Sequence, residues 1–322
     1  MKQDFLFKNL IETLQDRIPQ RGQLAEVLTE VLGIEKEAVY RRLRGSVPFS
    51  FQEIHTIALH FGLSLDSIAE NVSPNSRQLQ VITVELSEPQ EKYFKRIEDF
   101  TTSIDSLKDD PDSESGAIGS IIPSSICVNY EYIYKFYILQ WVHQFGNLQT
   151  MQTYAEISVP ERLQQLNRDF IESLRNTPKS VYIFDRSFIK YFINDVRFFY
   201  DIRQLSKEDV LLLKEELHLL IDDLERYANK GCFETGNKVE IYLANVHIDG
   251  NYNYIDASSF KLTMIRSFAF TDSYSYDEAV FRNMKIWLDF LKRTSTLISE
   301  GNMAERIRFF EEQRGLVDSM VL

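Results

Sequence analysis

Four basic residues lie close together in the first part of the chain: Lys36, Arg41, Arg42 and Arg44. One acid, Glu37, lies among them, so residues 36–45 carry a net charge of +3. A guanidinium group can donate two parallel hydrogen bonds to a guanine edge, a geometry that lysine cannot match. A short cationic helix held across a turn from a second helix presents such side chains to the major groove of DNA.

The residues around these cations predict a helix, a tight turn and a second helix. Apolar residues recur at helical spacing from about Gln23 to Leu32. Gly33 follows and is expected to end that helix, because glycine adopts the left-handed conformation at little cost. The second helix is expected from about Glu35 to Gly45, with its apolar side chains facing inward. The side chains left facing outward are Lys36, Glu37, Tyr40, Arg41 and Arg44.

Three further helices are expected in the same N-terminal region, over about 4–17, 51–61 and 64–69. Ser50 and Glu53 have the spacing of a capping box, in which each side chain bonds the backbone N–H of the other residue. Five short helices with these caps would make a compact unit. We therefore predict a helix-turn-helix domain over residues 1–72.

The run LGIEKEAVYRRLRG (32–45), then Pro48 and FQEIHTIALHFGLSLDSI (51–68), resembles the lambda-repressor/Cro-like (XRE) family of helix-turn-helix regulators. More loosely, the chain is similar to a regulator type of Bacteroidetes in which this domain precedes a long helical body. The resemblance implies double-stranded DNA as partner, with Lys36, Glu37 and Arg41 facing base edges. Sugar or phosphate contacts would come from Tyr40, Arg42 and Arg44 on that helix, and from Arg21 and Gln23 at the start of the preceding one.

The rest of the chain predicts a linker over 73–90 and a mostly helical body over 91–322. The acidic, small-residue segment 109–120 has the composition of a mobile loop. Residues 238–248, 252–255 and 261–270 are rich in β-forming residues and are expected to form a small antiparallel meander. Helices are expected over about 91–107, 124–145, 160–176, 185–202, 206–229, 276–299 and 303–319. The expected fold class is mainly α, with a five-helix N-terminal domain and a larger α+β body.

The charge of the chain is distributed unevenly. The net charge is -12, and residues 1–70 contribute -2 of it through eight basic and ten acidic residues, which leaves -10 for the remainder. An acidic body would discourage non-specific contact with phosphate. We expect a transcription regulator that binds DNA as a homodimer, because paired domains read two half-sites. The alternative is an effector-sensing or protein-interaction module whose helix-turn-helix scaffold does not bind DNA.

No pattern in the sequence predicts an enzyme, a metal site or a cofactor. The five histidines and the two cysteines form no ligand cluster, and no nucleophile–base or glycine-rich phosphate motif is present. The cysteines, the absence of a signal peptide and the absence of a long apolar run favour a cytoplasmic protein without membrane contact. Tyr130, Tyr134, Tyr137 and Trp141 share a helical face that would either pack in a core or line a pocket for a small-molecule effector.

Overall fold

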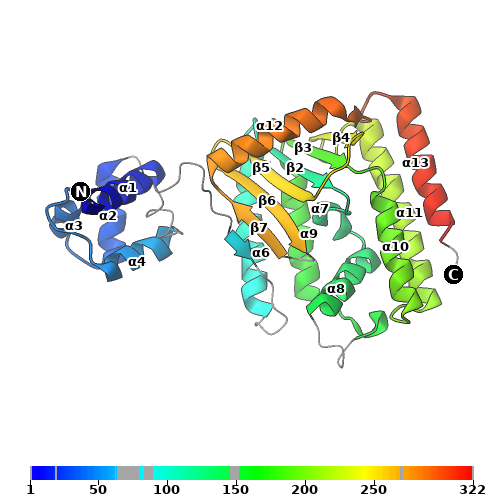
Figure 1. The fold of residues 1–322 in the computed structure, drawn as a ribbon, viewed down its shortest axis with the longest axis horizontal. Helices are drawn as coiled ribbons and strands as arrows, with labels where there is room; N and C mark the ends of the chain where they lie inside the picture. Colours follow the sequence, from blue (N-terminus) through cyan, green and yellow to red (C-terminus); the bar gives the residue numbers. More distant parts are fainter. Residues whose placement is uncertain are drawn as a thin grey trace. The chain divides into compact units, whose positions relative to one another are not determined.

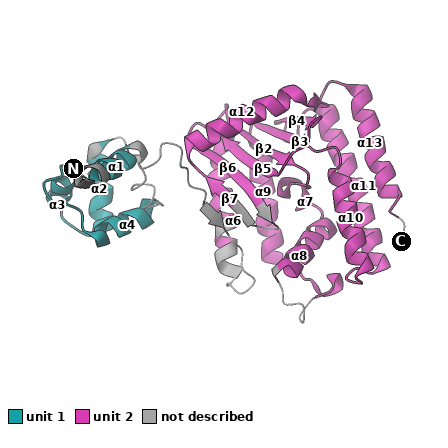
Figure 2. Ribbon diagram, in the orientation of Figure 1, with its two compact units in different colours: residues 1–78 teal, residues 79–322 magenta. Residues whose placement is uncertain are grey.

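The computed structural model describes residues 2–18, 20–61, 63, 80–82, 90–145, 152–268 and 271–320. The chain divides into two compact units, residues 1–78 and residues 79–322, which are called here the N-terminal and C-terminal units (Figure 2). The division falls within the segment 73–90 that the sequence predicts as a linker. As expected, the chain is mainly α-helical, with an α+β body.

The described part of the N-terminal unit consists of helices (Figure 1). Their bounds are α1 Lys2–Arg17, α2 Arg21–Leu32, α3 Lys36–Leu43 and α4 Phe51–Phe61. Leu14, Leu24, Leu28, Val39 and Ile57 are completely buried and belong to one apolar core. The fifth helix predicted over 64–69 lies outside the described residues.

The C-terminal unit combines a sheet with helices on both of its faces. The strands are β1 Gln80–Ile82, β2 Glu114–Gly119, β3 Lys179–Phe184, β4 Lys238–Leu243, β5 Asn251–Asp256, β6 Lys261–Phe268, β7 Thr271–Ser275 and β8 Thr296–Leu297. The helices are α6 Gln90–Asp105, α7 Ser124–Cys127, α8 Glu131–Phe145, α9 Glu161–Arg175, α10 Phe188–Asp201, α11 Lys207–Lys230, α12 Glu278–Thr294 and α13 Met303–Asp318. Short 3₁₀ helices span Ser106–Asp109 and Tyr154–Glu156.

These strands form one sheet in the order β1-β7-β6-β5-β2-β3-β4-β8. Strands β2, β3 and β4 are parallel, because helical crossovers join them, whereas their neighbours pair antiparallel. Helix α12 packs on one face of the sheet through Phe281, Met284, Leu288 and Leu291. The other face is covered in part by α6 and α9, while α10, α11 and α13 pack against one another (Figure 1).

The predicted loop over 109–120 is wrong, because this segment contains β2, at the centre of the sheet. Its small residues are needed there for packing. A Cβ atom at Gly116 would lie 2.1 Å from the Tyr254 ring, so only glycine fits against β5 at that position. The buried hydroxyls of Ser115 and Ser180 lie 3.2 Å apart and join β2 to β3. Composition alone does not reveal these partners, which are distant in sequence.

The predicted meander is only partly correct. Strands β5, β6 and β7 do pair antiparallel in succession, but β4 lies beyond β2 and β3 and pairs with β3 and β8. Strands β3, β7 and β8 were not predicted, and β8 lies within the helix expected over 276–299, which ends at Thr294. The helix expected over 124–145 is interrupted after α7, where Asn129 donates a side-chain hydrogen bond to the Ile126 carbonyl, a local contact that competes with helix formation. It resumes as α8 at Glu131.

Candidate nucleic-acid interface

Helix α3 is fixed to the N-terminal unit along one side. Val39 and Leu43 lie one turn apart and are buried against α2 and α4. The connection from α2 is tight because Gly33 adopts the left-handed conformation (φ 63°) and its N–H bonds the Thr29 carbonyl. Gly45 ends the helix with φ 76°. At about 100° per residue, Arg41 lies on the side of α3 opposite Val39 and Leu43, and it is exposed.

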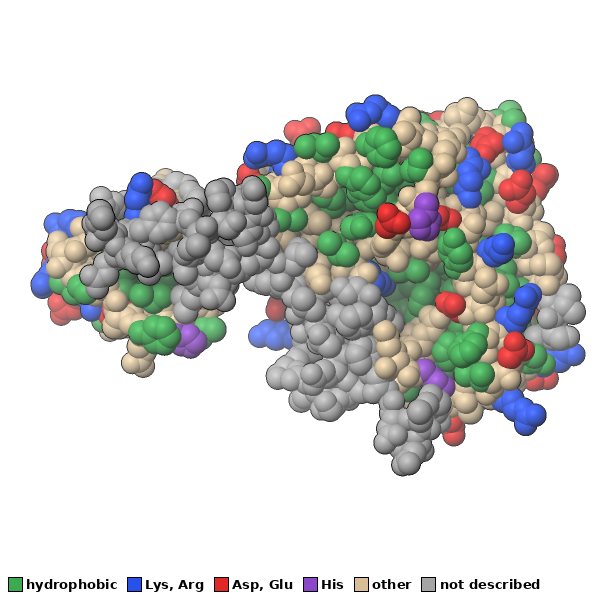
Figure 3. All heavy atoms as spheres, in the orientation of Figure 1, with side chains coloured by type: hydrophobic (Ala, Val, Ile, Leu, Met, Phe, Trp, Pro, Cys, Tyr) green, Lys and Arg blue, Asp and Glu red, His purple; other side chains and the backbone are tan. Residues whose placement is uncertain are grey.

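The exposed side of α3 carries charges of both signs. Lys36 Nζ lies 2.7 Å from Glu26 of α2, and this hydrogen bond raises the pKa of Lys36 and lowers the pKa of Glu26. Arg44 lies 2.9 Å from Glu37, with both side chains more than half exposed. The Arg41 side chain forms no ion pair or hydrogen bond with any described residue. In the space-filling view, basic and acidic side chains alternate at the edge formed by α3 (Figure 3).

Arg42 differs from the other cations of this helix. Its Nε and one terminal nitrogen bond the two Glu53 oxygens of α4 at 3.0 and 2.7 Å, and the other terminal nitrogen donates to the Ala38 carbonyl at 3.3 Å. The side chains of the pair are only 19% and 17% exposed. Burial would raise the pKa of Glu53, but the hydrogen bonds from Arg42 and Ser50 outweigh it and hold that pKa below its ordinary value. Arg42 therefore fastens α3 to α4.

Glu53 completes the predicted capping box of α4. The Ser50 N–H donates to Glu53 at 2.8 Å, and the Glu53 N–H donates to the Ser50 hydroxyl at 3.2 Å. This cap was expected from the local spacing. The contact of Glu53 with Arg42 was not expected, because the two residues lie on either side of a turn and no local pattern relates them.

The remaining predicted contact residues have different surroundings. Tyr40 is half-buried and packs on the edge of the apolar core. Gln23 is exposed in the first turn of α2, whereas the Arg21 side chain lies outside the described residues. The α2 N-cap, Gln20, makes no side-chain capping bond. Thus Gln23, Lys36, Glu37, Arg41 and Arg44 are exposed, and Arg42 is held within the unit.

The described residues provide neither a metal cluster nor a membrane span. These residues contain no group of three or more His, Cys, Asp or Glu side chains arranged to hold a metal ion. Within the same part of the chain, every helix is too short or too polar to cross a lipid bilayer.

The N-terminal region matches the model of a known domain family. Residues 3–88 match the BetR domain, a family of helix-turn-helix type that binds DNA. No curated protein and no solved structure matches the chain. The matched segment includes α1 to α4 and therefore the whole described surface around α3. The N-terminal region of this chain is thus similar to a DNA-binding regulatory domain.

Proposed function

We propose that this protein is a transcription regulator that places α3 in the major groove of duplex DNA. The observation that carries the proposal is the position of Arg41, which is exposed, unpaired among the described residues and opposite the buried side of α3. We assign Arg41 to base contact, with Lys36 and Glu37 beside it. This assignment agrees with the resemblance of residues 32–68 to lambda-repressor/Cro-like (XRE) regulators.

Arg44 suits phosphate contact although it already has a carboxylate partner. Exposed ion pairs contribute about 0–1 kcal/mol, so a phosphate displaces Glu37 at little cost. We assign Arg44 and Gln23 to the DNA backbone, with Tyr40 at the edge of the contact. We assign Arg42 to holding α3 in place, because DNA contact would require it to leave Glu53.

A homodimer belongs to the same proposal. A single helix of this length offers few contacts, and paired domains of this class read half-sites about 34 Å apart. We propose that the C-terminal unit joins two copies of the chain. Sedimentation of the full chain with and without duplex DNA measures this directly, and a monomer that binds DNA at one half-site would remove the dimer from the proposal.

The DNA proposal is tested with the full chain and with duplexes selected by it from a randomised library. Arg41→Ala should lose preference among bases at one position by about tenfold. Arg44→Ala should weaken binding to all duplexes and reduce the slope of log K against log salt by about 0.9. Lys8→Ala is the matched control, because Lys8 is an exposed cation of α1 paired with Glu12. If both arginine variants bind like the wild type at every salt concentration, the proposal is wrong.

The second candidate is an effector-sensing or protein-interaction module that does not bind DNA. The net charge of -2 over residues 1–70 favours it, because DNA-binding domains are commonly basic. A wild-type chain that selects no duplex from the library, at low as well as moderate salt, would support this candidate over the first.

A further inference from the structure

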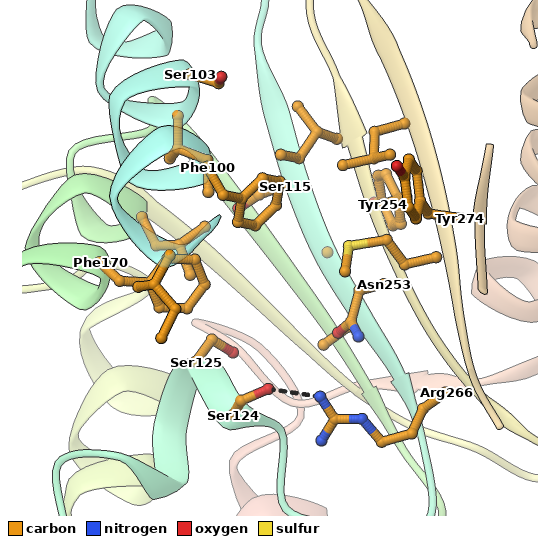
Figure 4. A pocket seen from close by; sticks show the side chains of 18 of the residues that line it. Phe100, Ser103, Ser115, Ser124, Ser125, Phe170, Asn253, Tyr254, Arg266 and Tyr274 are labelled. Atoms are coloured by element: carbon orange, nitrogen blue, oxygen red, sulfur yellow. Dashed lines mark hydrogen bonds between the residues drawn. The ribbon is translucent and has the colours of Figure 1, made fainter. Parts of the chain in front are cut away.

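The C-terminal unit contains a cavity of about 350 Å³ between the sheet and helices α6, α7 and α9 (Figure 4). This volume lies within the range of small-molecule sites. One row of the sheet forms the floor of the cavity, and its members are paired across five strands: Tyr182, Ala117, Asn253, Met264 and Tyr274. Of the four aromatic residues considered from the sequence, Tyr134 lines this cavity.

The cavity exists because the centre of the sheet is made of small residues. Strand β2 contributes Ser115, Gly116 and Ala117 to its lining, and none of these reaches far from the strand. The wall opposite is bulky, since Phe100 of α6 and Phe170 of α9 stack with ring centroids 5.8 Å apart. Small side chains facing large ones would normally interdigitate, but here a space remains.

The two ends of the cavity differ in polarity. Figure 4 shows Ser124, Ser125, Asn253 and Arg266 together at one end, where Arg266 donates to the Ser124 hydroxyl at 3.1 Å. Phe100 lies away from that end, and Phe170 lies between Phe100 and Ser125 in this view. Ser103, farthest from Arg266 in this view, is exposed, as is Asp99 one turn before it. These two residues mark where the cavity meets solvent.

Two amide side chains in the lining have no hydrogen-bond partner among the described residues. Asn167 of α9 is only 6% exposed, and Asn253 of β5 is half-buried. The polar atoms of both amides are not sealed within the protein, so they are available to a molecule in the cavity. A protein retains such groups where a ligand or water supplies the missing bonds. Apart from these amides, the serines, Asp99 and Arg266, the lining is made of apolar and aromatic side chains, as in pockets that hold an amphipathic molecule.

We propose that this cavity binds a small amphipathic carboxylate, such as a medium-chain fatty acid. The carboxylate would lie beside Arg266 and Ser124, and its oxygens would accept hydrogen bonds from those groups and from the Asn253 amide. The apolar body would lie along Phe100, Phe170 and Met264. The acid Asp99 at the solvent end repels a carboxylate there, which favours the orientation with the carboxylate at the Arg266 end.

The test is calorimetric titration of the full chain with decanoate, 1-decanol and decylamine below their aggregation concentrations. Decanoate should bind at least tenfold more tightly than either of the others. Arg266→Gln should weaken decanoate binding by about tenfold to a hundredfold, as expected for a lost charge-assisted hydrogen bond, and leave decanol unchanged. Arg197→Gln is the matched control, because Arg197 is an exposed arginine on α10, outside the cavity lining.

A second variant should reverse the preference of the cavity for decanoate over decylamine. Asn253→Asp is nearly isosteric and adds a negative charge beside the head of the ligand, so it should weaken decanoate binding and strengthen decylamine binding. The proposal is overturned if decanoate does not bind, if decanol binds equally well, or if Arg266→Gln and Arg197→Gln behave alike. None of these measurements uses DNA, so failure here leaves the proposed DNA-binding function standing.

Discussion

An exposed ion pair of the N-terminal unit and a buried carboxylate of the C-terminal unit have opposite roles. In the N-terminal unit, Glu37 and Arg44 are 73% and 53% exposed, and their pairing leaves both side chains open to a competing group. In the C-terminal unit, Glu114 at the start of β2 is only 10% exposed and lies among three lysines. The chemistry of the two pairings is the same. The comparison shows that burial decides whether a charge holds the fold together or stays available to a partner.

The buried carboxylate of Glu114 makes several strong contacts. Lys179 and Lys285 lie 2.8 and 3.1 Å from its oxygens, and the Tyr254 hydroxyl donates to it at 2.6 Å. Burial alone would raise the pKa of Glu114, but these hydrogen bonds and the nearby lysine charges lower it to about 2. Burial also lowers the pKa of Lys292, which lies 3.6 Å from the same carboxylate. Glu114 shares these lysines with Glu240 and Asp256, which lie 3.2 Å from Lys179 and 3.0 Å from Lys285.

The largest expected effect comes from removing that negative charge. Glu114→Gln should lower the free energy of unfolding of the C-terminal unit by about 3–5 kcal/mol, because three lysines lose a shared partner. Both tryptophans, Trp141 and Trp287, lie in this unit, so denaturant unfolding followed by tryptophan fluorescence reports it alone. Glu311→Gln, at an exposed position of α13, is the control. Equal midpoints for the two variants would contradict the role given to Glu114.

The second effect is a loss of stability in acid. The folded pKa of Glu114, about 2, lies below the ordinary value of 4.5. The stabilisation is therefore complete above about pH 4.5 and is lost as the pH falls toward 2, and it amounts to roughly 3 kcal/mol. The unfolding midpoint of the wild type should fall steeply over this window, whereas Glu114→Gln should show a shallower fall. Parallel pH profiles for both proteins would show that another group is responsible.

The smallest effect is expected from a comparison of a buried and an exposed ion pair within the N-terminal unit. Glu53→Gln weakens the pairing with Arg42 and the cap of α4, and should destabilise this unit by about 1–2 kcal/mol. Glu37→Gln removes an exposed pairing and should change stability by less than about 0.5 kcal/mol. Hydrogen exchange of the α4 amides, measured by mass spectrometry, distinguishes the two variants. Equal exchange rates would mean that the buried pair stabilises the unit no more than the exposed pair does.

The fold could be predicted from the sequence where the signals are local, but not where they depend on residues far apart in the chain. Helices α2, α3 and α4 follow from signals within a few residues of each other, such as Gly33 after an apolar run and Ser50 with Glu53. The helix expected over 206–229 also begins at a local signal, because Ser206 and Asp209 form a capping box at the start of α11. Strand β2 carries no such local signal. Gly116 has a purpose only when Tyr254 is beside it, and these residues are far apart along the chain.

The candidate interface could likewise be predicted where it depends on neighbouring residues of the chain. The apolar spacing of Val39 and Leu43 fixes the inward side of α3, and therefore the exposure of Lys36, Glu37, Arg41 and Arg44. The engagement of Arg42 depends on Glu53, eleven positions later and across a turn. The cavity was even less accessible to prediction, because its floor is assembled from five strands whose register appears only in the folded unit.

The central position of β2 has a consequence for the order in which this protein forms during its synthesis. Strand β2 needs β5, which ends at Asp256, and β1 needs β7, which ends at Ser275. The contacts described among α1 to α4, in contrast, join residues that all precede position 64. We therefore expect the first unit to fold while the ribosome is still synthesising the middle of the second. The sheet of the second unit can be completed only after its later strands have been synthesised.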